Sequence, residues 1–223
     1  MQPRIQTFKP RRGRYSQEQV AAIASSPLLV PLRETIPLDA HFGTMPVILD
    51  IGFGMGDATL AQAQQHPDVG ILAIDVHTPG VGRLLADLER NDIRNVRVVE
   101  GDALVLLHDL LPPASLIGIR TYFPDPWPKK RHHKRRIITP DNLDAMARCL
   151  QPGGFLHFAT DWQDYADAAR EAISAHPAFT LRDEGTALPY ASRATRPRTK
   201  FEARGIAAGR AITDLIATTR FGA

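Results

Sequence analysis

A glycine-rich turn that follows an acidic residue is the first feature of the sequence with a chemical meaning. The segment Asp50-Ile51-Gly52-Phe53-Gly54-Met55-Gly56 places a glycine at every second position, after an apolar run and before an amphipathic stretch. Glycines let a backbone turn tightly and approach a ligand at the carboxyl end of a strand. The spacing differs from the Gly-x-Gly-x-x-Gly of dinucleotide-binding folds, in which a helix N-terminus receives pyrophosphate. The carboxylate of Asp50 would repel a pyrophosphate and attract a sulfonium or an amino group.

Two more aspartates follow the next two apolar runs. Asp75 ends the second run, where its carboxylate can accept hydrogen bonds from both hydroxyls of a ribose. Asp102 follows the third run, within reach of an adenine amino group in the same crevice. Three acids at successive strand ends beside this glycine turn favour S-adenosylmethionine as the ligand, with NAD as the alternative. No metal is expected, because the single cysteine, Cys149, argues against a cysteine-ligated cluster.

A second candidate site combines aromatic, acidic and basic side chains. The segment Tyr122-Phe123-Pro124-Asp125-Pro126-Trp127-Pro128 leads directly into Lys129-Lys130-Arg131-His132-His133-Lys134-Arg135-Arg136. Prolines on both sides of Asp125 restrict the backbone and hold its carboxylate at the rim of the sheet. Tyr122 and Trp127 are candidate surfaces for stacking a base, and the cations suit phosphates. The alternative is an Asp-Pro turn with core aromatics, followed by a solvated loop.

The distribution of charge supports a polyanionic partner more than the net charge of +3 does. Residues 1–14 carry five basic residues and residues 129–136 carry six, with no acid in either segment. Eleven of the 27 basic residues therefore lie in these two segments, which leaves 16 against 24 acidic residues in the rest of the chain. An acidic body with two basic patches is typical of a protein that binds nucleic acid.

Short apolar runs alternate with amphipathic stretches from residue 47 onward. The pattern predicts strands over 47–50, 71–74, 96–99, 116–123 and 155–159. It predicts helices over 58–65, 81–90, 103–111, 164–174 and from about 139 to just before 152. Near-continuous apolar strands that alternate with helices indicate a doubly wound α/β domain, a parallel sheet covered on both faces. We assign this domain to residues 46–223 and treat residues 1–45 as a basic N-terminal extension.

Two features near the C-terminus have an ordinary structural explanation. Thr160 or Asp161 would serve as the N-cap of the helix expected over 164–174. Thr199-Lys200-Phe201-Glu202 matches a capping box, Thr-x-x-Glu.

Taken together, these segments resemble the bacterial tRNA (guanine-N7)-methyltransferase family. The match begins near Arg12-Gly13-Arg14 and ends near the C-terminus. Its most specific segments are residues 50–56, Phe123-Pro124-Asp125-Pro126-Trp127, Lys134-Arg135-Arg136, Ala159-Thr160-Asp161-Trp162 and Thr199-Lys200-Phe201-Glu202. The resemblance implies a Rossmann-like, mostly parallel seven-stranded sheet of the class I methyltransferases. It also implies transfer of a methyl group from S-adenosyl-L-methionine to N7 of the guanosine at position 46, in the tRNA variable loop, with S-adenosyl-L-homocysteine as product.

The resemblance also assigns residues to the site. The cofactor contacts are Asp50, Gly52, Gly54, Asp75, Asp102 and Asp125, of which Asp125 is also the catalytic residue. The substrate contacts are Lys129, Asp161, Thr199, Lys200, Phe201 and Glu202. The RNA-binding element consists of Arg131, His132, His133, Lys134, Arg135 and Arg136. The family often has Glu where this chain has Asp50 and Asp75, and often has Phe where this chain has Tyr122.

Methylation of guanine N7 sets modest chemical demands, because N7 carries a lone pair and no proton. The site must align the reacting atoms and place negative charge near a purine ring that becomes positive. Asp125 is expected to do this, with Asp161 in support. The rival interpretations are an amino-group methylase of DNA or RNA, an NAD-dependent dehydrogenase and an RNA-binding module with a decayed pocket. We expect a cytoplasmic monomer or homodimer that binds tRNA and no membrane, because no apolar run is long enough for a membrane span.

Overall fold

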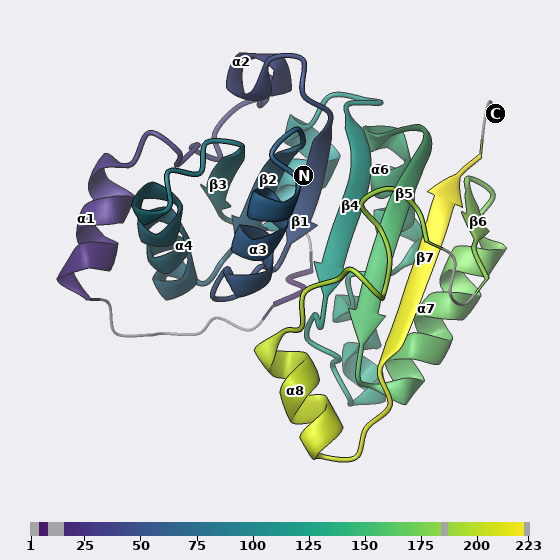
Figure 1. Cartoon of the computed structure of the whole chain (residues 1–223). Helices are drawn as coiled ribbons and strands as arrows, with labels where there is room; N and C mark the ends of the chain where they lie inside the picture. Colours follow the sequence, from purple (N-terminus) through teal and green to yellow (C-terminus); the bar gives the residue numbers. More distant parts are fainter. Residues whose placement is uncertain (1–4, 9–15, 184–186, 221–223) are drawn as a thin grey trace.

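The computed structural model describes residues 5–8, 16–183 and 187–220, and Figure 1 shows how they are arranged. Within this part of the chain, seven strands form one sheet in the order β3-β2-β1-β4-β5-β7-β6. The strands are β1 (Val47–Ile51), β2 (Gly70–Asp75), β3 (Val96–Glu100), β4 (Leu116–Tyr122), β5 (Leu150–Thr160), β6 (Phe179–Leu181) and β7 (Thr213–Thr219).

The order of the strands creates a crevice at one edge of the sheet. Strands β1 to β5 are parallel, and only β7 runs antiparallel to its neighbours β5 and β6. From β1 the chain first builds outward through β2 and β3, and then returns to place β4 on the other side of β1. The loops that follow β1 and β4 therefore diverge at their carboxyl ends, which is where open α/β sheets bind ligands.

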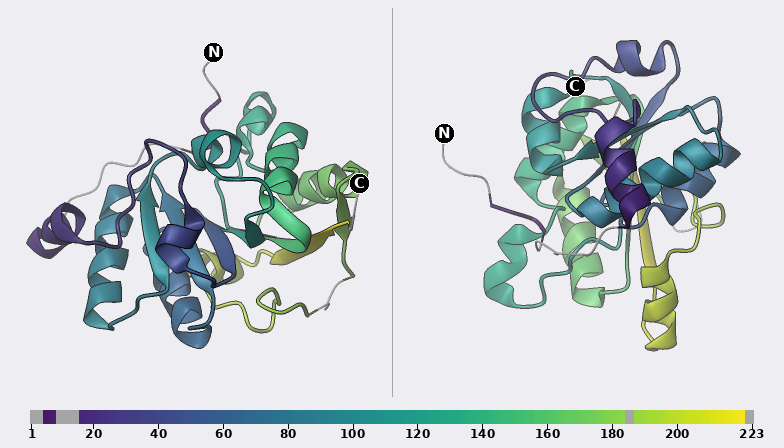
Figure 2. Two further views of the ribbon diagram at one scale, coloured as in Figure 1. Left: turned by 90° about the horizontal axis from the view of Figure 1, so that it is seen from above. Right: turned by 90° about the vertical axis from the view of Figure 1, so that its left-hand side faces the viewer.

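Helices cover both faces of the sheet, as Figure 2 shows from two further directions. They are α1 (Gln17–Ser25), α2 (Leu38–Phe42), α3 (Asp57–Gln65), α4 (Thr78–Arg90), α5 (Ala103–Val105) with the π-helix η1 (Leu106–Leu110), the 3₁₀-helix η2 (Lys130–Arg135), α6 (Pro140–Cys149), α7 (Gln163–Ala175) and α8 (Lys200–Ala207). Successive residues of β2 point into different cores: Ile71 and Ala73 pack with α3 and α4, whereas Leu72 and Ile74 pack with α5, α6 and α7. The predicted doubly wound, mostly parallel sheet is confirmed.

The predicted elements differ from the observed ones mainly at their ends. The helix expected from Val81 begins at Thr78, because Pro79 occupies its first turn. The helix expected over 103–111 is divided, since α5 passes into η1, where Leu111 N–H donates to Leu106 O at 3.0 Å. Strand β5 begins at Leu150, five residues before the predicted start. The basic run, expected as a loop, contains η2.

The described part of the N-terminal extension packs on the domain. Residues 28–30 lie along the edge strand β3, with reciprocal backbone hydrogen bonds of 2.8 Å from Val30 N–H to Val98 O and from Val98 N–H to Leu28 O. Helix α1 packs against α4, and Leu28, Val30 and Ile36 are buried. The extension thus covers an edge that would otherwise offer unpaired backbone groups.

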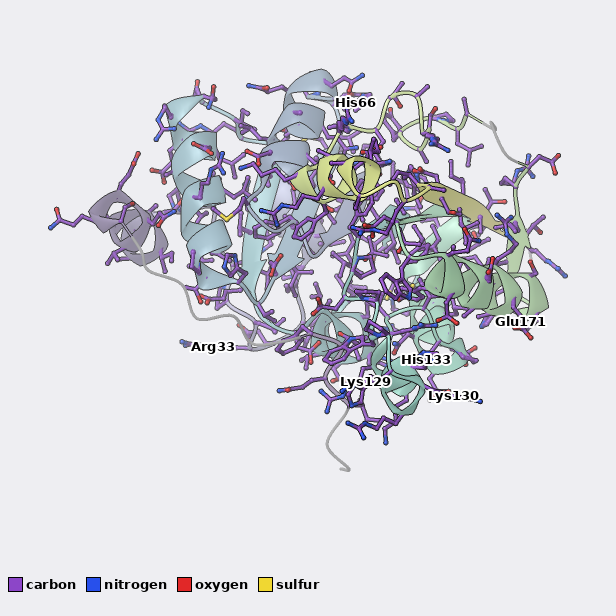
Figure 3. The ribbon with its side chains drawn as sticks, turned by 90° about the horizontal axis from the view of Figure 1, so that it is seen from below. Arg33, His66, Lys129, Lys130, His133 and Glu171 are labelled. Carbon is purple, nitrogen blue, oxygen red and sulfur yellow. The ribbon has the colours of Figure 1, made fainter. Side chains whose placement is uncertain are left out.

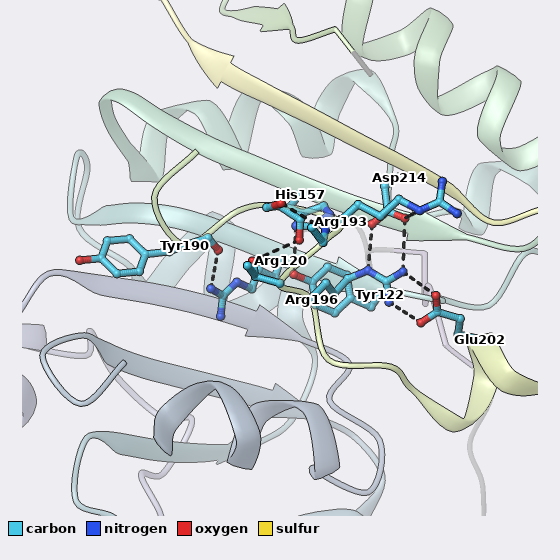
Figure 4. Close-up of polar contacts among 11 residues, drawn as sticks. Arg120, Tyr122, His157, Tyr190, Arg193, Arg196, Glu202 and Asp214 are labelled. Carbon is cyan, nitrogen blue, oxygen red and sulfur yellow. Dashed lines mark hydrogen bonds and ion pairs between the residues drawn. The ribbon is translucent and has the colours of Figure 1, made fainter. Parts of the chain in front are cut away.

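The buried Arg196 joins the C-terminal part of the chain to the sheet (Figure 4). Its side chain is 1% exposed and donates to Asp214 of β7 at 2.8 Å and to both carboxylate oxygens of Glu202 in α8 at 2.8 and 3.1 Å. The guanidinium also lies over the rings of Tyr122 and Phe123, 5.3 and 5.4 Å from their centroids. One side chain therefore fixes α8 relative to the ends of β4 and β7.

The carboxylate of Asp214 accepts a second buried hydrogen bond. His157 Nε2 lies 2.9 Å from Asp214 Oδ1, and its Nδ1 lies 3.1 Å from the Tyr122 hydroxyl. Burial holds the pKa of His157 below its usual value, although the hydrogen bond to Asp214 opposes this shift. The ring is therefore neutral, and it donates a hydrogen bond to Asp214 and accepts one from Tyr122. Burial alone would raise the pKa of Asp214, but the hydrogen bonds from His157 and Arg196 hold it below the ordinary value.

Replacing Arg196 with Met is expected to lower the free energy of unfolding by about 3–5 kcal/mol, because Asp214 and Glu202 lose the cation that compensates their burial. Urea denaturation measures the loss. Since the contact depresses the pKa of Asp214, the difference from the parent should be present above about pH 4 and shrink as the pH falls further.

Arg193→Met is the matched control for this change. Arg193 lies 3.8 Å from the same Asp214 carboxylate, but its side chain is 61% exposed, so its loss should change the free energy of unfolding by no more than about 0.5 kcal/mol. Equal losses in the two variants would contradict the anchoring role of Arg196.

Candidate active site

The larger of two neighbouring cavities opens at the carboxyl ends of β1, β2 and β4, on the edge that faces the viewer in Figure 3. The glycine turn and Asp75 form one wall, and the loop after β4 forms the other. Its lining includes Gly52, Gly54, Met55, Asp75, His77, Gly101, Ala103, Phe123, Pro124, Asp125, Ile137 and Phe201, together with Thr7 and Phe8 from the N-terminal segment. The topology therefore brings residues from seven separate parts of the chain to one crevice.

The glycine turn depends on backbone conformations that favour glycine. Gly52, Gly54 and Gly56 have φ values of +76°, +63° and +83°, which are strained for residues with a Cβ. At Gly80, in the first turn of α4, a Cβ would lie 1.7 Å from the carbonyl oxygen of Gly54. The turn and α4 thus pack backbone against backbone. The role of Gly80 was not predicted from the sequence, where its only signal is its place in Pro79-Gly80-Val81-Gly82.

Asp75 both supports this turn and lines the cavity. One carboxylate oxygen accepts from Gly54 N–H at 2.7 Å and the other from His77 N–H at 2.8 Å. Burial raises the pKa of Asp75, and these two backbone hydrogen bonds oppose the rise. Asp75 lies at the carboxyl end of β2 and in the lining of the cavity, and its contact with a cofactor stays a prediction.

The other two strand-end aspartates do not line the larger cavity. Asp50 is 4% exposed and accepts from the Thr59 hydroxyl at 2.6 Å; it lies in a smaller neighbouring cavity. Burial raises the pKa of Asp50, against the opposing hydrogen bond from Thr59. Asp102 is the N-cap of α5 and accepts from Leu104 N–H at 2.9 Å, while its neighbours Gly101 and Ala103 line the cavity.

The loop after β4 presents Asp125 through an unusual backbone. Phe123 and Trp127 have φ values of +53° and +45°, in the left-handed region that residues with a Cβ rarely occupy. Phe123 N–H donates to Ala159 O at 2.7 Å, which ties the loop to β5. Phe123, Pro124 and Asp125 line the cavity. The loop is thus held in one strained conformation with its carboxylate at the crevice.

The two aromatic residues that were expected to stack a base are occupied within the protein. Trp127 is 4% exposed, and its Nε1–H donates to Thr7 O at 2.9 Å. The expectation of an open stacking face on Trp127 is therefore wrong. Tyr122 borders only the smaller cavity, and burial raises the pKa of its hydroxyl to about 12. Phe8, Phe123 and Phe201 are the phenylalanines that line the larger cavity.

The basic run separates into exposed and buried cations. Lys129, Lys130, Arg131 and Lys134 are exposed, His132 and His133 are half-buried, and Figure 3 labels several of them beside the crevice. Arg135 is half-buried and lies over the Trp127 ring, 4.9 Å from its centroid.

Arg136 differs from the rest of this run. Its side chain is 3% exposed, donates to Pro126 O at 3.0 Å, pairs with Asp164 and covers the Tyr165 ring at 4.7 Å. Arg136 was expected to contact RNA. The structure instead shows its guanidinium bonded to Pro126 and Asp164, which holds the loop after β4 against α7. The sequence could not separate Arg136 from its neighbours, because Asp164 is 28 residues away.

The remaining expected substrate residues gather around α8. Asp161 does not cap α7, whose N-cap is Trp162; instead it pairs with Arg210 at 2.7 Å. Thr199 caps α8 and accepts from Glu202 N–H at 3.1 Å, as expected, but the Glu202 carboxylate turns to Arg196 and does not complete the capping box.

Three residues of this segment border the smaller cavity. They are Thr199, Lys200 and Phe201, which lie across from Asp50 and Tyr122. Phe201 is 40% exposed and borders both cavities. Lys200 is 64% exposed and lies 3.4 Å from Asp57. The segment therefore forms a wall between the two cavities.

Neither a metal site nor a membrane helix is found in residues 5–8, 16–183 and 187–220. These residues contain no group of three or more His, Cys, Asp or Glu side chains placed to hold a metal ion. None of their helices is long and apolar enough to cross a bilayer.

Solved structures with a similar fold have low sequence identity to this chain and include several methyltransferases. The 16S rRNA methyltransferase KamB superposes with a TM-score of 0.56 at 18% identity, over 84% of this chain and 94% of that chain. Phosphoethanolamine N-methyltransferase 2 of Haemonchus contortus, in complex with S-adenosyl-L-methionine, gives a TM-score of 0.50 at 13% identity, over 83% and 51%. These similarities concern the fold.

Sequence comparison is more specific. Residues 44–215 match the model of a family described as putative methyltransferase. A tRNA (guanine-N(7)-)-methyltransferase of Streptomyces avermitilis is 46% identical over 222 residues, which cover 96% of this chain and 74% of that protein. The enzyme of the same name from Nitrosomonas europaea is 44% identical over 223 residues, which cover 97% of both. The chain therefore belongs to the tRNA (guanine-N7)-methyltransferase family.

Proposed function

We propose that the chain transfers a methyl group from S-adenosylmethionine to N7 of a guanosine in tRNA, the one at position 46 of the variable loop. The observation that carries this proposal is the crevice itself, in which Asp75 and the glycine turn lie opposite Asp125, with exposed cations beside the opening. We assign the activity to residues 46–223, with residues 1–45 as an extension. A tRNA substrate also makes the cytoplasm the expected location.

The cavity fits S-adenosylmethionine better than NAD. The left-handed glycines leave the backbone open to a ligand, and the Asp75 carboxylate can accept from ribose hydroxyls. Among the described residues, the lining holds Asp75 and Asp125 but no Lys or Arg, so a pyrophosphate would meet carboxylates without a compensating cation. When bound, S-adenosylmethionine supplies a methyl group on a positively charged sulfur.

Asp125 is proposed to act by position and charge. Guanine N7 carries no proton, so no general base is required, and a carboxylate beside the ring stabilises the positive charge that develops there. The left-handed Phe123 and the flanking prolines fix Asp125 before substrate arrives, which limits the reorganisation needed. Asp161, held by Arg210, is assigned a supporting role at the base.

The roles of the other expected site residues are assigned from their exposure, the cavity that they line and their ion pairs. Lys129, Arg131 and Lys134 are proposed to bind phosphates, with Lys130 beside them. Thr199, Lys200 and Phe201 are proposed to border the base, since they line the smaller cavity next to the cofactor site. Glu202 and Arg136 are proposed to shape the site through their ion pairs with Arg196 and Asp164. Asp50 and Asp102 are proposed to support the cofactor site, from the smaller cavity and from the N-cap of α5.

The purified chain, incubated with tritiated S-adenosylmethionine and undermodified tRNA, is expected to release 7-methylguanosine on nuclease digestion. Mapping of the fragments should place the label in the variable loop. Label in an N-methylated exocyclic amine, or no incorporation into any tRNA, would contradict the proposed function.

Asp75→Ala is expected to weaken S-adenosylmethionine binding at least ten-fold, because it removes charge-assisted hydrogen bonds that contribute roughly 1.5–3 kcal/mol each. It also removes the acceptor for Gly54 N–H, so the turn loses its support. Calorimetry measures the affinity, and tRNA affinity should change little.

Asp57→Ala serves as the control for Asp75→Ala. Asp57 is a nearby carboxylate that lines only the smaller cavity and makes exposed ion pairs with Arg83 and Lys200. Its loss should leave cofactor affinity within about two-fold of the parent. Unchanged cofactor binding in Asp75→Ala would reject the role assigned to Asp75.

A further inference from the structure

A third basic segment lies near the C-terminus, outside the two that the charge distribution first indicated. Residues 187–213 contain six basic residues and one acid, Glu202. Two of the six are committed to internal contacts: Arg196 is buried between Asp214 and Glu202, and Arg210 pairs with Asp161. The structure leaves the others at the surface.

Three of the exposed cations gather at α8. Arg198 and Arg204 are exposed, and no carboxylate of the described residues lies within ion-pair distance of either. Lys200 is 64% exposed and lies 3.4 Å from Asp57. We call Arg198, Lys200 and Arg204 the α8 surface.

The positions of these cations do not favour the helix that carries them. Arg198 and Lys200 flank the N-cap Thr199, where the helix dipole is positive and cations are unfavourable. Lys200 and Arg204 stand four residues apart on one helix face, where like charges also destabilise. The single acid of the first turn, Glu202, is turned inward to Arg196. A polyanion on this surface would offset all of these unfavourable terms.

The α8 surface and η2 lie on opposite sides of the crevice (Figure 3). Phe201 of α8 lines the cavity on one side, and Asp125 and Ile137, which flank η2 in the chain, line it on the other. A nucleotide that enters the cavity must therefore pass between the two groups of cations. Its backbone would run on toward η2 in one direction and toward α8 in the other.

The α8 surface is also held in place before any partner binds. Glu202 is fixed by Arg196, and Gly205 packs so closely on Asp161 that a Cβ would lie 2.8 Å from the Asp161 Cβ. Asp161 in turn binds Arg210, just beyond the helix, at 2.7 Å. Because the helix is already held in place, binding would cost little conformational entropy.

We propose that the α8 surface binds RNA phosphates, so that the substrate backbone is held at two places, by η2 on one side of the target nucleotide and by α8 on the other. The proposal rests on the proposed function in taking tRNA as the partner. It adds a second phosphate-binding surface and the direction in which the RNA crosses the crevice.

The test compares three double variants of equal charge change. Arg198→Ala with Arg204→Ala removes the α8 cations but spares Lys200, which borders the smaller cavity. Lys130→Ala with Lys134→Ala removes two exposed cations of η2. Arg94→Ala with Arg182→Ala, two exposed residues near the outer strands β3 and β6, is the control. tRNA affinity is measured over a range of salt, and phosphate-ethylation interference identifies the phosphates that each variant requires.

The α8 and η2 variants should each reduce the salt slope of tRNA binding by about 0.7–0.9 for each lost contact, and the control should not. Ethylation interference should disappear at phosphates on one side of the target guanosine in the α8 variant and on the other side in the η2 variant. Calorimetric binding of S-adenosylmethionine should be equal in all three, which shows that the variants are folded.

An α8 variant whose salt slope equals that of the control would overturn the proposal, as would loss of the same phosphates in the α8 and η2 variants. These outcomes leave the proposed function intact if the parent protein methylates tRNA. A parent protein that neither binds nor methylates tRNA would overturn both.

Discussion

The buried contact of Arg196 with Asp214 and Glu202 determines how the C-terminal part of the chain meets the parallel sheet. Asp214 is the second residue of the antiparallel strand β7, and Glu202 lies in the first turn of α8. The contact matters for the site because α8 contributes to the lining of both cavities. A buried ion pair contributes little net stability relative to apolar packing, but it tolerates only one geometry. Its value here is that it fixes Phe201 and the α8 surface relative to Asp125.

The same reasoning explains why part of the site could be predicted from the sequence. The glycine turn and Asp75 were predicted because local backbone requirements and the topology of a parallel sheet set their positions. Asp50 was expected beside them in the cofactor site, but its side chain lines the smaller neighbouring cavity. It shares a strand face with the buried Ile48, and the next residue, Ile51, lines the cavity. A shift of one residue along a strand moves a side chain to the other face.

The sequence could not predict which of the basic and aromatic side chains are exposed and which make contacts inside the protein. Lys134, Arg135 and Arg136 are neighbours with similar charge, but distant groups give them different surroundings: solvent, the Trp127 ring and the Asp164 carboxylate. Trp127 is withdrawn from the crevice by a backbone contact with Thr7, 120 residues earlier. Strand β6 has three residues and no pattern that distinguishes it from a loop. Tertiary contacts decided each of these outcomes.

A tRNA with 7-deazaguanosine at the target position tests whether the crevice directs the methyl group to guanine N7. This nucleotide keeps every donor and acceptor of the base-pairing edge but lacks the N7 lone pair. We expect this tRNA to bind with an affinity close to that of the parent tRNA, to inhibit competitively and to accept no methyl group. Methyl transfer to the substituted nucleotide would contradict methylation at N7, because an exocyclic or N1 nitrogen would then be the acceptor and the site would be that of an amino-group methylase.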